Sequence, residues 1–217
     1  MKQKTHSTVS PERPRGRPMD TGQHDLKAQI LDTAEQLFTD HGYAATSIRN
    51  IADSAGVNPA LVHYYFGNKH ALLEAVLQHS LEPMVKALAS LKTRESVSVE
   101  DIATLLIPMA AAHPNIPRLL TREVLLPGGE MQDYFLEHLA PQLGGALPAL
   151  LEREKIAGNL REDIDPAYAA LMVLAVCFFP FIARSLAEPV FGINLGTDGA
   201  ETLTQHVSEL LKRGLLA

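Results

Sequence analysis

The chain has 217 residues, of which 46% are hydrophobic, and a formal net charge of −6 at pH 7. It is long enough for a substantial core, and its acidic balance excludes a protein that binds polyanions over its whole surface. The single cysteine, Cys177, excludes an internal disulfide and a zinc site built from several cysteines. No apolar leader follows the first basic residues, so we expect a cytoplasmic protein.

Residues 1–22 are polar and rich in Pro, Ser, Thr and charge, which predicts a disordered basic arm. The centre of this segment reads RPRGRP and contains Arg13, Arg15 and Arg17. Flexible arginine-rich arms can bind in the minor groove of DNA. The alternative is a solvated tail that only aids solubility, and the arm alone does not separate the two.

The next residues have the periodicity of helices. Apolar residues recur at helical spacing from Leu26 to Phe38, and Gly42 suits the left-handed backbone at the end of that helix. A second, short helix is expected over 46–55, with Thr46 as its N-cap. Its inner face would carry isoleucine and alanine, and Gly56 would end it.

A third helix is expected over 58–65, because Asn58 is a good N-cap and Pro59 is tolerated at the first helical position. Gly67 ends this helix, and Asn68 can cap a long fourth helix in which Pro83 should produce a kink.

Two short helices separated by Gly56 and Val57 indicate a helix-turn-helix. The outer face of the 58–65 helix can then enter the major groove of DNA, which is wide enough to admit a helix. Helix N-termini and basic residues beside it can bind phosphates. The residues expected to contact DNA are Thr46, Ser47, Arg49, Asn58, Pro59, Ala60, His63, Tyr64 and Lys69.

The run ILDTAEQLFTDHGYAATSIRNIADSAGVNPALVHYYFGNKHALLEAVL resembles the DNA-binding domain of the TetR family of transcriptional regulators. The matching features are the A..LF...GY..TS...IA..AGV run and the YYF.NK..L ending, within residues 25 to about 77. The resemblance implies a homodimer that binds a near-palindromic double-stranded DNA operator. It also implies release by a small-molecule effector held in the C-terminal domain, and it supports a DNA-binding role for the arm.

This chain departs from the family pattern at the third helix. It reads PALVHYYF where members commonly read KGTLYYHF, and Gly67 stands where a basic residue usually precedes the Asn–Lys pair. The operator sequence therefore does not transfer from a relative.

The rest of the chain also reads as helical, and the predicted fold class is all-α. Ser98 with Asp101 should cap a helix over 99–112, and further helices are expected at 116–126, within 129–156, and after Asp165 and Pro166. The predicted organisation is a basic arm (1–22), a TetR-type helix-turn-helix domain (23–83) and a helical effector-binding and dimerisation domain (84–217).

The stretch 167–183 has no charged residue and is near the short limit for a membrane span. We favour a buried or interface helix instead and expect no membrane partner. The resemblance implies that helices at about 166–186 and 199–214 form the homodimer interface.

A mostly apolar effector pocket is expected between the C-terminal helices. Its candidate lining residues are Met109, His113, Arg122, Phe135, His138, Tyr168, Met172 and Phe179.

Two other classes of function compete with gene regulation. The sequence has no nucleophile elbow, HExxH, P-loop or GxGxxG motif and no histidine pair at helical spacing, so we expect no enzyme, metal or cofactor. The other alternative is a helical ligand-binding or adaptor protein that has lost DNA binding. The intact caps, Arg49, Lys69 and the basic arm favour DNA binding.

Overall fold

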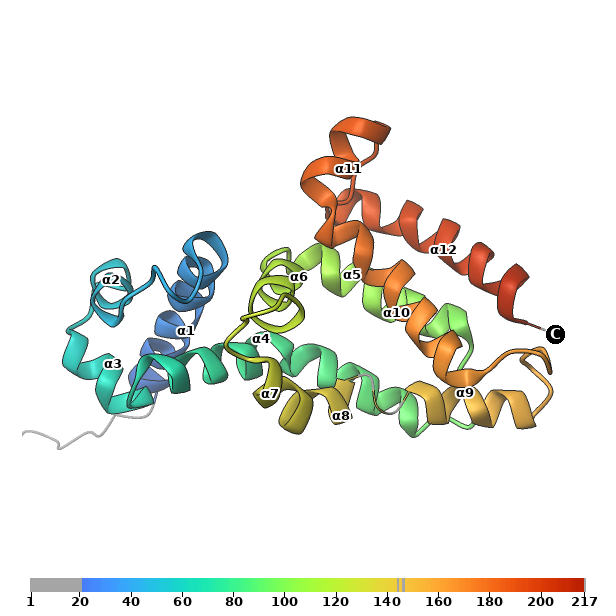
Figure 1. Ribbon diagram of the computed structural model, residues 1–217, viewed down its shortest axis with the longest axis horizontal. Helices are drawn as coiled ribbons and strands as arrows, with labels where there is room; N and C mark the ends of the chain where they lie inside the picture. The colour runs from blue at the N-terminus through green and yellow to red at the C-terminus, as the bar shows by residue number, and fades with distance from the viewer. Residues whose placement is uncertain (1–20, 144, 146, 217) are drawn as a thin grey trace, which may run out of the picture.

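The computed structural model of the chain describes residues 21–143, 145 and 147–216. The predicted arm with Arg13, Arg15 and Arg17 lies outside these residues. Within them the fold is all-α, as predicted, and the only β-type pairing is an isolated bridge between Leu160 and Leu216. The molecule is elongated, with the first three helices at one end and the C-terminus toward the other (Figure 1).

The N-terminal end is formed by α1 (Thr21–His41), α2 (Ile48–Ser54) and α3 (Pro59–Phe66). From α3 the chain enters α4 (Lys69–Lys92), a 24-residue helix that runs away from this end into the rest of the molecule (Figure 1). Pro83 lies inside α4 without ending it.

The C-terminal region is built around α5 (Val99–Ala112), which contacts α4 and two further helices, α10 and α12. A capping box of Ser98 and Asp101 starts α5, as predicted. The remaining elements are α6 (Asn115–Leu120), the π-helix η1 (Thr121–Leu125), α7 (Gln132–Tyr134), the π-helix η2 (Phe135–Leu139), α8 (Ala140–Leu143), α9 (Leu147–Ile156), α10 (Pro166–Ile182), α11 (Arg184–Phe191), the 3₁₀ turn η3 (Thr197–Gly199) and α12 (Ala200–Leu215).

The start of α10 agrees with the prediction from sequence. The carboxylate of Asp165 accepts the N–H groups of Ala167 and Tyr168, and Pro166 takes the first helical position. The predicted end of this helix, at about residue 186, is wrong. The helix ends at Ile182, and α11 leaves it at an angle of 79°.

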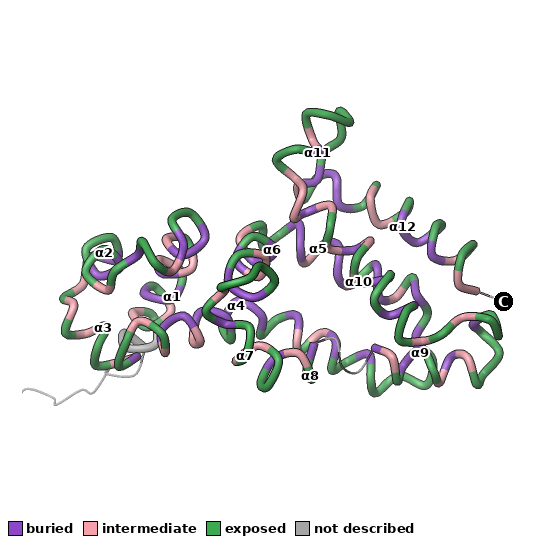
Figure 2. Tube along the Cα trace, in the orientation of Figure 1, coloured by how far each residue is buried: buried purple, intermediate pink, exposed green. Residues whose placement is uncertain are grey.

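The helix α11 projects from the body of the molecule (Figure 1) and is mostly exposed (Figure 2). The proline at position 180 removes one backbone donor from the last turns of α10, which accounts for a break near this point. The prediction of helical structure within 129–156 is confirmed: α7, η2 and α8 follow one another without a gap from Gln132 to Leu143, and α9 covers Leu147–Ile156.

The buried side chains form one connected apolar core that runs from α1 to α12 (Figure 2). Among the residues described, no individual helix has both the length and the apolarity of a membrane span, although the bent pair α10 and α11 together reaches them.

Candidate DNA-binding interface

The α2–α3 unit has the geometry of a helix-turn-helix. Ala52 is fully buried in α2, and its carbonyl accepts the N–H of Val57 at 2.9 Å, which closes the turn. Gly56 has a φ of +66°, and a Cβ added there would have no heavy atom within 4 Å, so backbone conformation rather than space requires glycine. The predicted turn at Gly56–Val57 is therefore confirmed.

The start of α2 differs from the prediction. Ser47, not Thr46, is the N-cap: its hydroxyl accepts the N–H of Asn50, and the Asn50 side chain accepts the N–H of Ser47, both at 3.1 Å. Thr46 is only 3% exposed, and its hydroxyl donates to the carbonyl of Gly42 at 2.8 Å. It turns inward because the end of α1 leaves carbonyl groups without helical donors. Its side chain is thus not presented to DNA.

The N-terminus of α3 is capped as predicted. The side-chain oxygen of Asn58 accepts the N–H of Ala60 at 2.9 Å, and Pro59 follows the cap. Because the oxygen is used by the cap, the group that Asn58 can offer to DNA is its NH₂, which is a donor. Asn58 and Ala60 are exposed and Pro59 is half-buried.

The crowded aromatic stretch divides between core and surface. Val62 and Phe66 are buried, Tyr65 is half-buried, and His63 and Tyr64 are exposed, with Tyr64 77% exposed. Nδ1 of His63 lies 2.7 Å from the carbonyl oxygen of Gly67. A carbonyl only accepts, so Nδ1 donates in this contact, and Nε2 is left as the polar ring atom that can contact DNA.

Arg49 has the most accessible charge of this unit, with 85% of its side chain exposed. Its nearest acidic group is Asp53, at 3.9 Å on the next turn, which is a weak surface pair. The guanidinium is therefore free to bind phosphate or a base edge. Ser47 is exposed beside it, at the N-terminus of α2.

Lys69 has a different environment from the one expected for a phosphate contact. Its ammonium donates to the carbonyls of Tyr43 at 2.9 Å and Thr46 at 3.0 Å, and lies 4.0 Å from the centroid of the Tyr43 ring. Burial, together with Glu130 and Glu123, raises the pKa of the Tyr43 hydroxyl. Lys69 therefore fixes the α1–α2 loop, and sequence reasoning missed this role because its partners are backbone atoms distant in sequence.

The structure does not gather the predicted effector residues into one pocket. Arg122 donates to the carbonyl of His41 at 2.9 Å and so faces the N-terminal end. His113 and His138 are exposed, and Met109 and Phe135 pack half-buried against the core.

Three further predicted pocket residues lie on the outer face of α10. Tyr168, Met172 and Phe179 are 68%, 53% and 63% exposed. The inner face is displaced by one position and carries Val173 and Cys177, both fully buried. The uniform apolarity of this helix left the orientation of its faces open, and this is why the predicted face was wrong.

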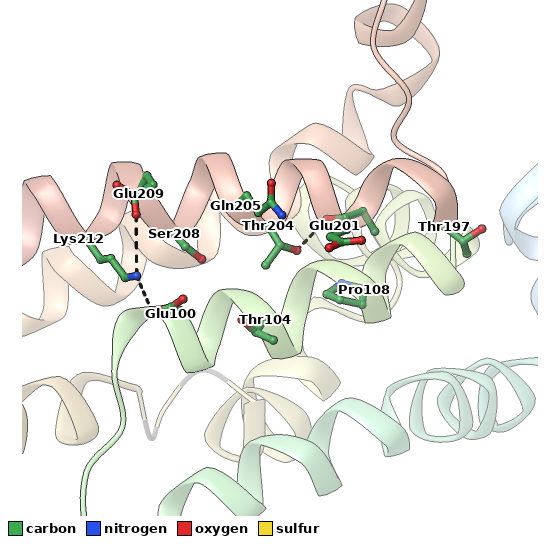
Figure 3. Close-up of a pocket in the computed structure, with 11 residues that line it drawn as sticks. Glu100, Thr104, Pro108, Thr197, Glu201, Thr204, Gln205, Ser208, Glu209 and Lys212 are labelled. Carbon is green, nitrogen blue, oxygen red and sulfur yellow. Dashed lines mark hydrogen bonds and ion pairs between the residues drawn. The ribbon is translucent and has the colours of Figure 1, made fainter.

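A groove of 620 Å³ lies between α5 and α12 (Figure 3). It is lined mainly by polar side chains, including Thr104, Gln205 and Glu209. Lys212 pairs with Glu100 across it at 2.6 Å (Figure 3). None of the eight predicted effector residues lines this groove. In the part of the chain that the structure describes, no three His, Cys, Asp or Glu side chains gather as a metal site.

Comparison with known proteins identifies two regions. The family model described as "Bacterial regulatory proteins, tetR family" matches residues 30–76, and "Tetracyclin repressor-like, C-terminal domain" matches residues 96–214, which is more than half of the chain. The first region contains the helix-turn-helix, and the second contains α5 to α12 except for Leu215, the last residue of α12.

Individual relatives agree with these matches. The HTH-type transcriptional repressor NicS of Pseudomonas putida is 27% identical over 192 residues, covering 86% of this chain and 90% of that protein. The HTH-type transcriptional regulator RutR of Escherichia coli is 27% identical over 157 residues, covering 69% and 70%. These relatives are transcriptional regulators rather than enzymes.

Among solved structures, the fatty acid degradation regulator FadR from Bacillus halodurans has the same fold, with a TM-score of 0.69 at 23% identity over 87% of this chain and 95% of that one. The family matches, the helix-turn-helix geometry and the shared fold lead to one conclusion: the chain belongs to the TetR family and is a DNA-binding transcriptional regulator.

Proposed function

We propose that this regulator is a repressor that binds a near-palindromic operator as a homodimer and is released by a small molecule held in its C-terminal domain. The observation that carries the DNA-binding part is the outer face of α3, where His63 and Tyr64 stand exposed beside a capped helix N-terminus. The groups on this face are donors and acceptors of the kind that read base edges and bind phosphates.

The homodimer is supported by the outer surface of α10. Tyr168, Leu171, Met172 and Phe179 are more than half exposed on one helix, which leaves a contiguous apolar face. Exposed apolar surface of this kind marks interaction sites, and obligate dimer interfaces resemble a hydrophobic core cut in half. A two-fold homodimer through α10 and α12 would carry two α3 helices, one for each half of a near-palindromic operator.

Release by an effector is supported by a solved structure with the same fold, that of a transcriptional regulator from Saccharomonospora viridis in complex with choline. The effector must bind the DNA-free arrangement more tightly than the DNA-bound one, because equal affinity for both would shift nothing. The predicted contact of Arg13, Arg15 and Arg17 with the minor groove remains part of the proposal.

The test begins with selection of bound duplexes from a random DNA library by the full chain, followed by fluorescence anisotropy on the selected sequence. We expect two inverted half-sites whose centres lie about 34–36 Å apart or somewhat more, and affinity that falls steeply with salt. Tyr64→Ala should weaken binding by about tenfold, which corresponds to the usual value of a good base or phosphate contact.

The matched control is Lys86→Ala. Lys86 is an exposed cation paired with Glu82 on α4, about 26 Å along that helix from its start. It should bind DNA as the wild type does. A chain that selects no sequence even at low salt would support the adaptor alternative and contradict the proposal.

The effector part is tested separately. Compounds that raise the melting temperature of the protein are added to the labelled complex, and at least one class should release the DNA. Stabilising compounds that leave DNA affinity unchanged would contradict regulation by release.

A further inference from the structure

The segment formed by α6 and η1 lies along the end of α1 and makes a row of polar contacts with it. These contacts join the effector domain to the DNA-binding end without passing through α4. Four of its residues, at helical spacing, take part. The contacts are Asn115 to Gln36 (3.1 Å), Arg118 to Asp40 (3.5 Å), Arg122 to the carbonyl of His41 (2.9 Å) and Glu123 to the N–H of Tyr43 (3.1 Å).

Glu123 is the buried member of this row. Only 4% of it is exposed, although it carries a carboxylate, and that carboxylate accepts the backbone N–H of Tyr43. Arg122 lies 3.8 Å from the same carboxylate. Burial of a carboxylate costs free energy unless the carboxylate is paired and hydrogen-bonded. The burial of Glu123 therefore indicates that its polar contacts, rather than packing alone, account for a glutamate here.

The loop that receives these groups is shaped for a close approach. Gly42 has a φ of +84°, and a Cβ at this position would overlap the guanidinium of Arg122. The glycine therefore serves both the end of α1 and the docking of Arg122. On the other side of the loop, Lys69 holds the carbonyls of Tyr43 and Thr46.

The loop is thus held on one side by the C-terminal domain and on the other by the start of α4. Glu123 holds the N–H of Tyr43, and Lys69 holds the carbonyl of the same residue. The loop leads directly into α2, where Arg49 lies three residues after Thr46. The position of the loop therefore determines the positions of α2 and α3.

Glu123 is also fixed from the effector side. It lies in the π-helix η1, whose i to i+5 bond joins the N–H of Leu126 to the carbonyl of Thr121 at 3.0 Å. The carbonyl of Glu123 accepts the N–H of Met131 at 2.9 Å, and a Cβ on Gly129 would overlap that carbonyl. π-helical turns inside helices often occur at functional sites.

We infer that Glu123, supported by Arg122, is a positioning residue for DNA binding: it holds the α1–α2 loop in the DNA-binding arrangement and makes that arrangement depend on the register of η1. This inference rests on the proposed function in that the effector-free structure is the one that binds the operator. A shift in the π-helical turn would withdraw the carboxylate from Tyr43 and release the loop on that side. Occupancy of DNA and the state of η1 would then be linked in both directions.

The first experiment needs no DNA. Glu123→Leu removes the acceptor and puts an apolar side chain of similar size in its place, whereas Glu123→Gln keeps an acceptor. Hydrogen–deuterium exchange should show the Tyr43 amide exchanging at least about tenfold faster in Glu123→Leu, and near the wild-type rate in Glu123→Gln. The control is Glu137→Ala, at an exposed carboxylate on η2. An unchanged Tyr43 amide in Glu123→Leu would overturn the inference whether or not the chain binds DNA.

The second experiment tests the link. Addition of the selected operator should slow exchange of the η1 amides in the wild type and in Glu137→Ala. In Glu123→Leu the operator should bind about fivefold or more weakly and, at saturation, should no longer slow exchange in η1 while still slowing it in α3. A merely structural role would leave the η1 response in place, and that result would overturn the inference.

Arg122→Ala is the second variant if Glu123→Leu does not fold. Its side chain is half-exposed, so the fold should survive. We expect a weaker form of the same loss, and a full wild-type response in η1 would count against the inference. Failure of the wild type to bind any DNA would overturn the proposed function, whereas the Tyr43 exchange result would still stand on its own.

Discussion

The ammonium of Lys69 lies over the ring of Tyr43, 4.0 Å from its centroid, and donates to the carbonyl oxygen of the same residue at 2.9 Å. A cation that is held in this way by protein groups is not available to neutralise a phosphate. Lys69 should therefore affect DNA binding by fixing the loop, whereas Arg49, which is exposed, should affect it by charge.

Salt dependence separates these two roles. Arg49→Ala should reduce the slope of log affinity against log salt by about 0.9, the value for one lost phosphate contact. Lys69→Met should lower both affinity and the melting temperature but leave the slope near that of the wild type. Anisotropy titrations between about 50 and 200 mM salt measure both slopes. A full unit lost from the slope in Lys69→Met would show that this lysine reaches the backbone of DNA.

His63 should affect sequence preference. With Nδ1 donating to the carbonyl of Gly67, Nε2 is left to contact the edge of a base. His63→Ala should therefore relax the preference at one position of each half-site and cost about 1–3 kcal/mol on the preferred base. Repeating the selection with the variant measures this. An unchanged preference would show that His63 does not contact a base.

The outer face of α10 predicts that dimerisation is sensitive to charge. Met172→Glu places a carboxylate on an exposed position of the monomer, where it costs little, but at the centre of the proposed interface, where it would be desolvated. Sedimentation should show a dimer for the wild type and a monomer for the variant. The control is Leu136→Glu, at a 60% exposed position on η2. Equal masses for Met172→Glu and the wild type would place the interface elsewhere.

Cys177 should be unreactive in the folded chain. It is fully buried in α10, and burial raises the pKa of its thiol to about 12, so very little thiolate forms near neutral pH. A thiol reagent should label the unfolded chain completely within a time in which the native chain shows no labelling. Ser90→Cys, on an exposed position of α4, supplies a reactive reference. Native labelling of Cys177 at that reference rate would show that α10 opens readily.

Glu154 should make part of the stability depend on acid. Burial alone raises its pKa, but hydrogen bonds from Asn159, the N–H of Val97 and the hydroxyl of Ser96, at 2.7, 2.9 and 2.8 Å, outweigh burial and bring the pKa below its ordinary value of 4.5. A lowered folded pKa means that the charged form stabilises the fold above the unfolded pKa. This contribution is lost as the pH falls from about 4.5 through the folded pKa.

The variant Glu154→Gln should be less stable by about 1–3 kcal/mol at neutral pH, because an amide group would face donors. Its stability should also fall less between about pH 5 and 3 than that of the wild type. Urea unfolding at several pH values measures both effects, with the exposed Glu152→Gln as control. Parallel pH curves for Glu154→Gln and the wild type would contradict the assignment.

The sequence predicts well where local chemistry decides the structure. The Asn58–Pro59 start of α3, the Ser98–Asp101 box and the Asp165–Pro166 start of α10 are satisfied by neighbouring residues, so their signals can be read directly. The same logic could have found the N-cap of α2. Ser47 and Asn50 have the spacing of a capping box, and this spacing indicates Ser47 rather than Thr46 as the N-cap.

The sequence predicts poorly where the partner is distant. Which side of α10 faces inward depends on helices that pack later, so a nearly uniform apolar run does not show that Met172 points out and Val173 points in. Arg122 was expected in a pocket, but a backbone carbonyl 81 residues away receives it. Contacts of this kind leave no periodic signal in the chain.

The uninterrupted course of α4 has a mechanical consequence. A helix of 24 residues is about 36 Å long, so tilting one end by about 5° displaces the other by about 3 Å. That displacement equals the length of a hydrogen bond, and it arises without any melting of the helix. In a symmetric pair of subunits the two displacements would add. A slight rotation among the C-terminal helices is then enough to change the distance between the two α3 helices, so that it no longer matches successive turns of the double helix.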